Sequence, residues 1–134
     1  MTREIITTDQ APAPVGPYNQ AIAASGKMLF VSGQIAINPA TNLLVHEGDV
    51  AQQTVQVMAN LAGVLTKAGA SWKDVVKTGV FLKDMNDFAT VNSIYAQYFE
   101  EANAPARACV EVARLPKDVL VEIDCIAVIP DHVT

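Results

Sequence analysis

Charged residues near the C-terminal end of the chain stand inside otherwise apolar segments, where charge is costly to bury. Residues 103–129 read NAPARACVEVARLPKDVLVEIDCIAVI, so Arg107, Glu122 and Asp124 are interspersed with aliphatic side chains. An arginine binds a carboxylate through two parallel hydrogen bonds. A glutamate can orient a water molecule and accept its proton. These residue types either form a small-molecule site or a structural ion pair, and the stretch alone leaves both readings open.

Two strands, at residues 107–113 and 119–129, are expected to carry these charges on either side of a Leu-Pro-Lys-Asp turn. Side chains alternate between the faces of a strand. In the second strand the odd-numbered residues are all apolar, so they should face the core and leave Glu122 on the other face. In the first strand we expect Ala108, Val110 and Val112 to face the core, which places Arg107 and Cys109 on the same face as Glu122.

A further strand at residues 27–37 should place Leu29, Val31 and Gly33 on the core side and Phe30 and Ser32 on the other. The second face of the sheet then mixes polar groups with large apolar side chains. A solvated face would not hold so many of these together. We therefore expect another copy of the chain to cover it.

The helices are expected to lie on the opposite face of this sheet. Asp49 is a suitable N-cap for a helix that ends near Gly69, with Gln52 placed as in a capping box. A second helix begins after Asn86 or Asp87 and ends before Pro105. With further strands at 3–7, 18–24 and 74–84, the order is β-β-β-α-β-α-β-β. We predict one α+β domain over residues 1–134, with a mixed six-stranded sheet and both helices on one face.

The composition and charge of the chain exclude several classes of function. The chain has 134 residues, 51% hydrophobic and 17% charged, which is typical of a globular domain. Its 9 basic and 14 acidic residues give a net charge of −5 with no cluster of Lys and Arg, so nucleic-acid binding is not expected. There is no long apolar run and no signal-like N-terminus, so we expect a cytoplasmic protein that binds no membrane. Cys109 and Cys125 have no metal-ligand spacing, so we expect free thiols and no metal.

Several residues have an ordinary structural interpretation. Cys109 is expected to be an inert thiol, because no histidine lies nearby in any predicted element. Ser32, just before Gly33, could simply be a small residue at a close approach of two strands. Tyr18 alone could be core filling.

Four segments together resemble the Rid reactive-intermediate deaminases, also called the YjgF family. They are GPYNQA (16–21), FVSGQI (30–35), DVVKTGVFLKDMNDFATVNSIYAQYF (74–99) and APARACVEVARLPKDVLVEIDCIA (104–127). The resemblance implies a chorismate-mutase-like fold and a homotrimer with clefts between subunits. It also implies hydrolysis of the enamines and imines that pyridoxal-phosphate enzymes release, such as 2-aminoacrylate, 2-iminopropanoate and 2-iminobutanoate, to 2-oxo acids and ammonia. No cofactor is implied.

The resemblance also assigns roles to single residues. Arg107 is similar to the arginine that binds the substrate carboxylate, and Glu122 to the glutamate that handles the attacking water. The backbone at Cys109 would face the substrate nitrogen. The walls of the cleft would be formed by Tyr18, Ser32, Gly33 and Asn92.

This chain departs from the common pattern of the family at several positions. Asn19 follows the tyrosine where serine is common, and Asn42 replaces a usual turn glycine. Gly79 stands where threonine is frequent, and Ala108 where serine or threonine is frequent. The last two would alter the shape of the cleft and the choice of substrate. Two alternatives to a deaminase remain: a trimeric carboxylate-binding or regulatory protein without turnover, and an endoribonuclease, which the acidic composition disfavours.

Overall fold

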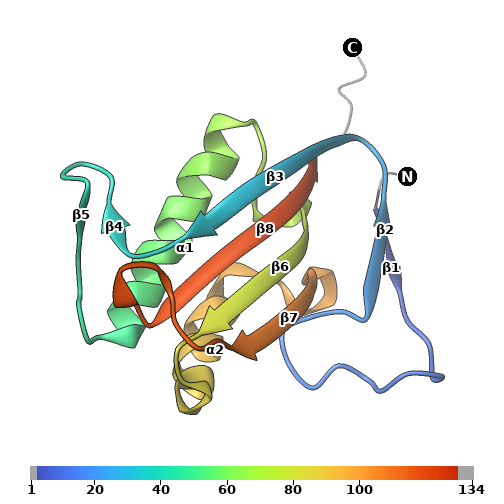
Figure 1. The fold of residues 1–134 in the computed structure, drawn as a ribbon. Helices are drawn as coiled ribbons and strands as arrows, with labels where there is room; N and C mark the ends of the chain where they lie inside the picture. The colour runs from blue at the N-terminus through green and yellow to red at the C-terminus, as the bar shows by residue number, and fades with distance from the viewer. Residues whose placement is uncertain (1–2, 130–134) are drawn as a thin grey trace.

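The computed structural model describes residues 3–129, which form an α+β structure around one four-stranded sheet. Strands β6 and β7 are parallel, and the other neighbours are antiparallel. Both helices cover the same face of this sheet (Figure 1). The strand order is β3 (Lys27–Gln34), β8 (Val121–Ile129), β6 (Val75–Leu82) and β7 (Ala106–Glu111); the helices are α1 (Val50–Lys67) and α2 (Phe88–Tyr95).

The predicted six-stranded sheet is wrong, because the first two strands form a hairpin of their own. Strand β1 (Arg3–Ile6) pairs only with β2 (Ala21–Ala24). At Gly26 the backbone φ is +141°, a conformation that favours glycine, and there the chain turns from β2 into β3. The guanidinium of Arg3 holds the hairpin in place through hydrogen bonds to Asn103 and to the Val75 carbonyl. A two-residue ladder joins β4 (Ile37–Asn38) and β5 (Leu43–Leu44).

Helix α1 follows the prediction closely. The Asp49 side chain accepts a hydrogen bond from the Gln52 N–H at 3.0 Å, so it caps the first turn. Met58, Leu61 and Leu65, at helical spacing, are almost fully buried against the sheet.

Helix α2 is shorter than predicted, because it ends at Tyr95 and continues only as short 3₁₀ turns at Ala96–Tyr98 and Glu101–Asn103. Tyr95 joins the helix to the sheet: it is fully buried, and its hydroxyl shares a 2.8 Å hydrogen bond with Thr78 Oγ1 on β6. Burial raises the pKa of Tyr95 to about 12, so the phenol stays protonated.

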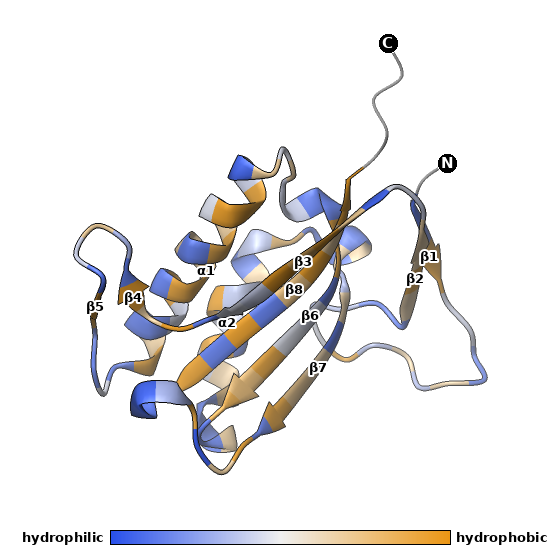
Figure 2. Ribbon diagram, turned by 45° about the horizontal axis from the view of Figure 1, so that its top comes forward, coloured by the Kyte–Doolittle hydropathy of each residue, from blue (hydrophilic) through white to orange (hydrophobic). Residues whose placement is uncertain are grey.

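The faces of β8 are those predicted. Residues Val121, Ile123 and Cys125 are buried beneath the helices, and Glu122 and Asp124 lie on the other face, called the open face below. Figure 2 shows β8 with hydrophobic and hydrophilic residues in alternation. Large apolar side chains accompany the carboxylates on this face: Phe30 is 71% exposed and Met28 is 50% exposed.

The predicted faces of β7 are wrong. Arg107 is the register partner of Thr78, whose side chain is buried on the helix face, so Arg107 also lies on the helix face. Ala108 is exposed and Val110 is 43% exposed, on the open face. The pairing with β6 decides which side chains of this edge strand face the helices. The sequence Ala-Arg-Ala-Cys-Val does not reveal this, because its apolar and polar residues do not alternate clearly.

A bulge in β3 corrects a second prediction. Val31 pairs with Cys125, but Gln34 pairs with Ile123, so β3 holds one extra residue between these two pairs. The extra residue turns Gly33 from the predicted core side to the open face, and beyond it Ala36 is fully buried.

Candidate functional site

The first half of the candidate site surrounds Arg107, and we call it the arginine half-site (Tyr18, Asn92, Arg107 and Cys109). The guanidinium lies over the rings of Tyr95 and Tyr18, at 4.9 and 5.4 Å from their centroids. A third ring, that of Phe88, is 5.6 Å away. Such contacts attract a cation and exclude water from its faces. The Arg107 side chain is therefore fixed, with its polar edges as the remaining sites for hydrogen bonds.

Two elements bring partners to Arg107. Asn92 stands one helical turn before Tyr95 in α2, and its Oδ1 accepts a 2.6 Å hydrogen bond from Arg107 Nη1. Tyr18 comes from the loop that follows the N-terminal hairpin's first strand. Asn19 ties this loop to the start of β7 through hydrogen bonds to the Ala104 and Pro105 carbonyls.

Arg107 forms no ion pair with a carboxylate within residues 3–129. The salt bridge in this range joins Arg114 and Asp118. Only Nη1 of Arg107 donates to a protein acceptor within that range, the amide oxygen of Asn92. Arg107 and Glu122 therefore form no ion pair within one chain, and a structural pair between them at an interface of two copies stays a prediction. The other donors of the guanidinium can bind a carboxylate in a bidentate manner.

Cys109 lies on the same side of β7 as Arg107. Burial raises the pKa of the Cys109 thiol, and the nearby Arg107 opposes this only in part. A raised pKa keeps the thiol protonated and poorly nucleophilic. The Val112 N–H donates to the Leu82 carbonyl of β6, so by alternation the backbone groups of Cys109 point to the free edge of β7.

The second half of the candidate site lies on the open face, and we call it the glutamate half-site (Ser32, Gly33 and Glu122). A Cβ atom on Gly33 would overlap the Glu122 carboxylate, so glycine is required for this close approach. Ser32 is exposed beside it. Burial and then the charge of Asp124 raise the pKa of Glu122, which makes this carboxylate a better proton acceptor than an ordinary surface glutamate.

The structure thus brings the predicted site residues together in two groups rather than one. Arg107 stands on the edge strand β7 and on the helix face, whereas Glu122 stands two strands away on the open face. The sequence prediction that Arg107 and Glu122 share a face is wrong.

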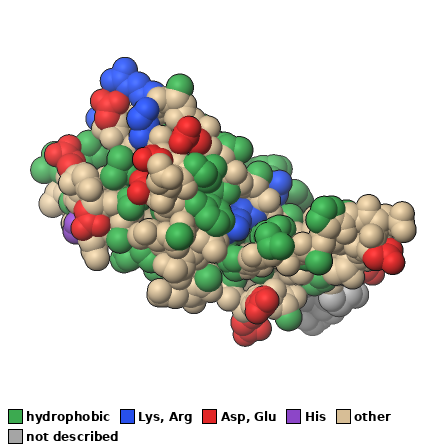
Figure 3. All heavy atoms as spheres, turned by 90° about the horizontal axis from the view of Figure 1, so that it is seen from below, with side chains coloured by type: hydrophobic (Ala, Val, Ile, Leu, Met, Phe, Trp, Pro, Cys, Tyr) green, Lys and Arg blue, Asp and Glu red, His purple; other side chains and the backbone are tan. Residues whose placement is uncertain are grey.

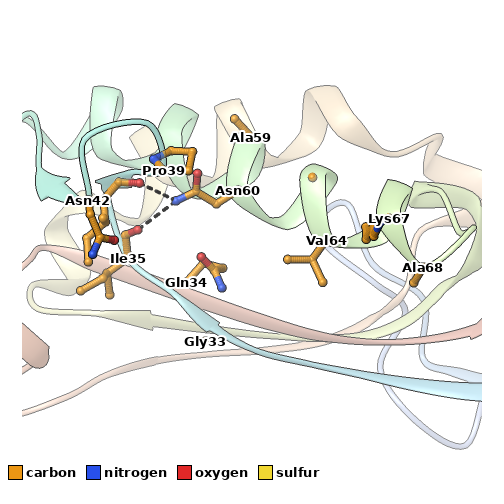
Figure 4. Close-up of a pocket in the computed structure, with 12 residues that line it drawn as sticks. Gly33, Gln34, Ile35, Pro39, Asn42, Ala59, Asn60, Val64, Lys67 and Ala68 are labelled. Atoms are coloured by element: carbon orange, nitrogen blue, oxygen red, sulfur yellow. Dashed lines mark hydrogen bonds between the residues drawn. The ribbon is translucent and has the colours of Figure 1, made fainter.

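A hollow of 720 Å³ that sequence reasoning missed lies between β3 and α1, next to the glutamate half-site (Figure 4). Gly33 and Gln34 border it from the strand, and Asn60 and Val64 from the helix. The Asn60 side chain spans one end by donating hydrogen bonds to the Ile35 and Ile37 carbonyls. The sequence signal for this hollow was Asn60, a polar residue in the middle of an amphipathic helix.

Two negative findings apply to the described part of the chain. No group of three or more His, Cys, Asp or Glu side chains there could hold a metal ion. No helix within residues 3–129 combines the length and the apolar character needed to cross a bilayer.

Known proteins are similar to this chain in sequence and in fold. The profile of the family described as endoribonuclease L-PSP matches residues 8–129. A "RutC family protein" of Synechocystis is 68% identical over 130 residues, covering 97% of this chain and 99% of that protein. The 2-iminobutanoate/2-iminopropanoate deaminase of Escherichia coli K12 is 52% identical over 125 residues, covering 92% and 95%. The protein belongs to this endoribonuclease L-PSP family. A solved structure of a Rid family protein from Yersinia pestis has a TM-score of 0.74 at 46% identity, covering 95% and 99%.

The family is described as an endoribonuclease, an activity that would require this Rid protein to bind RNA. The net charge is −5. On the face that Figure 3 shows, acidic and basic side chains are interspersed with apolar ones, and Lys and Arg form no continuous stripe. This face offers no basic track for a phosphate backbone.

Proposed function

We propose that this protein hydrolyses 2-imino acids, and the enamines that tautomerise to them, to 2-oxo acids and ammonia. The substrates would be 2-iminopropanoate, which arises from 2-aminoacrylate, and 2-iminobutanoate. The observation that carries the proposal is the Arg107 guanidinium, fixed by Asn92 and three aromatic rings and paired with no carboxylate within the described residues. A small 2-imino acid supplies that carboxylate.

The rest of the substrate would lie beside the free edge of β7. With its carboxylate on Arg107, the imine nitrogen can donate to a backbone carbonyl near Cys109, which favours the protonated iminium. Protonation makes the adjacent carbon more electrophilic. The Cys109 thiol takes no part in this step.

Glu122 would handle the water molecule. The carboxylate orients a water molecule toward the imine carbon and accepts a proton as the C–O bond forms, which gives a carbinolamine. That proton then passes from Glu122 to the nitrogen. As the C–N bond breaks to release ammonia, Glu122 takes up the hydroxyl proton, which leaves the carbonyl of the 2-oxo acid. The balance is one imine and one water in, one oxo acid and one ammonia out. Neither an oxidant nor a metal ion enters the balance.

Because Arg107 and Glu122 lie on opposite faces of one sheet, the proposed site requires two copies of the chain. The arginine half-site of one copy would meet the glutamate half-site of its neighbour. A homotrimer of cyclic symmetry provides such a contact three times, since each copy then offers one half-site to each neighbour. The exposed Phe30 and Met28 support burial of the open face by another subunit.

The test is release of ammonia from freshly generated 2-aminoacrylate or 2-iminobutanoate, measured with and without the protein. Arg107→Lys keeps the charge but loses the planar fork, so it should severely impair turnover. Arg114→Lys is the matched control and should behave as wild type, because Arg114 is exposed and, among residues 3–129, forms its salt bridge with Asp118. Equal ammonia release with and without the wild-type protein would contradict the proposal.

A carboxylate-binding protein without turnover is distinguished by Glu122→Gln. This change preserves the size and hydrogen bonding of the side chain but removes the proton acceptor. Turnover should fall about 10²–10⁴-fold while calorimetric binding of 2-oxobutanoate stays close to wild type. Binding without any turnover in the wild type would favour the alternative.

A further inference from the structure

Asp124 stands two residues after Glu122 on β8, on the same open face, and the reaction proposed above does not use it. Its Oδ1 accepts a 3.0 Å hydrogen bond from the Gly79 N–H of β6. Gly79 is the register partner of Asp124, and Ala108 of β7 is the next partner in this row. All three border a hollow of 480 Å³ that Ser32 also lines. Gly79 and Ala108, which have small side chains or none, thus lie in register with Asp124 on neighbouring strands.

Gly79 is required for the position of the Asp124 carboxylate. A Cβ atom at residue 79 would lie 2.6 Å from Asp124 Oδ1 and 3.1 Å from the ring of Phe81. The first distance is shorter than van der Waals contact allows, so any larger residue at 79 would displace the carboxylate. The Asp124 carboxylate can therefore bind the Gly79 N–H only because residue 79 has no side chain.

We propose that Asp124 is a positioning residue for Glu122: the Gly79 N–H fixes its carboxylate, whose negative charge makes Glu122 the stronger proton acceptor. Like charges that share one face of a strand disfavour ionisation of each other. The pKa of Glu122 is raised by burial first and by Asp124 second, which agrees with this geometry. For its catalytic meaning the inference rests on the proposed deaminase function, but the interaction of the two carboxylates does not depend on it.

The other groups that face Glu122 carry no second negative charge among the described residues. On β6, Lys77 is the register partner of Ile126, and Lys83 lies opposite Leu120, to whose carbonyl its N–H donates. The Lys83 ammonium donates to the Ala113 carbonyl. Within the same chain, neutral neighbours complete the surroundings: Ser32 and Gly33 on β3, Phe81 on β6, and Val110 on β7. Removal of the Asp124 charge therefore tests the effect of a neighbouring carboxylate on the proton affinity of Glu122.

The experiment is a titration of the glutamate side-chain carboxyl carbons by NMR. The Glu122 signal is assigned as the one missing from Glu122→Gln. Asp124→Asn removes the charge but keeps an oxygen that can accept the Gly79 N–H. Glu122 should titrate at lower pH in this variant than in wild type. Asp9→Asn, the same change at an exposed aspartate on the N-terminal loop, should leave the titration of Glu122 unchanged.

An activity measurement adds the catalytic part. In Asp124→Asn the acidic limb of the kcat/KM profile should move to lower pH, and the plateau should fall about threefold to tenfold as Glu122 becomes a weaker base. Asp124→Ser, which also removes the charge and keeps an oxygen acceptor, gives the same test if the asparagine variant does not fold. Titration of Glu122 at the wild-type pH in the uncharged variant would overturn the inference. Absence of deaminase activity in the wild type would refute only the proposed function, because the NMR titration is independent of it.

Discussion

Arg107 and Glu122 lie on opposite faces of one sheet, on strands β7 and β8 that β6 separates. Arg107 points to the helices and contacts Asn92, whereas Glu122 approaches Gly33 on the open face. A single copy therefore cannot present both side chains to one small molecule. The proposed active site is therefore shared between neighbouring copies.

The first prediction concerns assembly. Phe30 is 71% exposed on a face that no helix covers, and burying such a side chain stabilises by roughly 1.5–3 kcal/mol. Light scattering at micromolar concentration should give three times the chain mass of 14.3 kDa. Phe30→Asp should shift the mass toward smaller species, since it places a charge in the proposed interface. A stable wild-type monomer would exclude a shared site.

The second prediction concerns the close approach of β3 to Glu122. Gly33→Ala places a methyl group where the Glu122 carboxylate lies, so it should displace the base and lower kcat by about 10²-fold. Gly63→Ala is the matched control, because a Cβ there meets nothing within 4 Å. It should leave kcat unchanged and raise the free energy of unfolding by about 0.5–1 kcal/mol through better helix propensity. Wild-type kcat in a folded Gly33→Ala variant would show that Glu122 is not the base.

The third prediction concerns the thiol nearest to Arg107. Burial raises the pKa of Cys109, which leaves little thiolate at neutral pH, and the proposed mechanism uses only the backbone at this position. Cys109→Ala should therefore retain most of the wild-type turnover. Cys125→Ala, at the other and more deeply buried thiol, should mainly lower stability. A folded Cys109→Ala protein at the uncatalysed rate would require a thiol mechanism instead.

The fourth prediction concerns RNA. With 9 basic residues and a net charge of −5, the sequence has no cluster of Lys and Arg that would bind a phosphate backbone. Highly purified protein should cleave no RNA in a gel assay at physiological salt. Cleavage by the wild type that disappears in Arg107→Ala at equal purity would contradict this, because a contaminating nuclease would be present in both preparations.

The sequence predicts those elements whose patterns are strong. In β8 the odd-numbered residues are all apolar over the whole strand, so the faces of Glu122 and Asp124 follow from alternation. In α1 the Asp49 cap and the buried Met58, Leu61 and Leu65 follow from helical spacing. The separate hairpin of β1 and β2 does not follow, because strand partners depend on contacts such as those of Arg3 with Asn103.

The candidate site is less predictable, since it depends on register. The face of Arg107 is set by its partner Thr78 on β6 and by the rings that surround the guanidinium, none of which is adjacent in sequence. The face of Gly33 is set by the bulge between Val31 and Gln34. In each case an offset of one residue reverses the face of every side chain that follows.

The central claim, a site that combines Arg107 of one copy with Glu122 of another, is tested most directly by mixed assemblies. Arg107→Ala and Glu122→Gln chains with different affinity tags are co-expressed, and assemblies that carry both tags are isolated. Each variant alone should be inactive. In a mixed cyclic trimer about one site in three pairs an intact arginine with an intact glutamate, so roughly a third of the wild-type rate should return. If both residues acted from the same chain, every site would lack one of them, and a mixed assembly without activity would contradict the account.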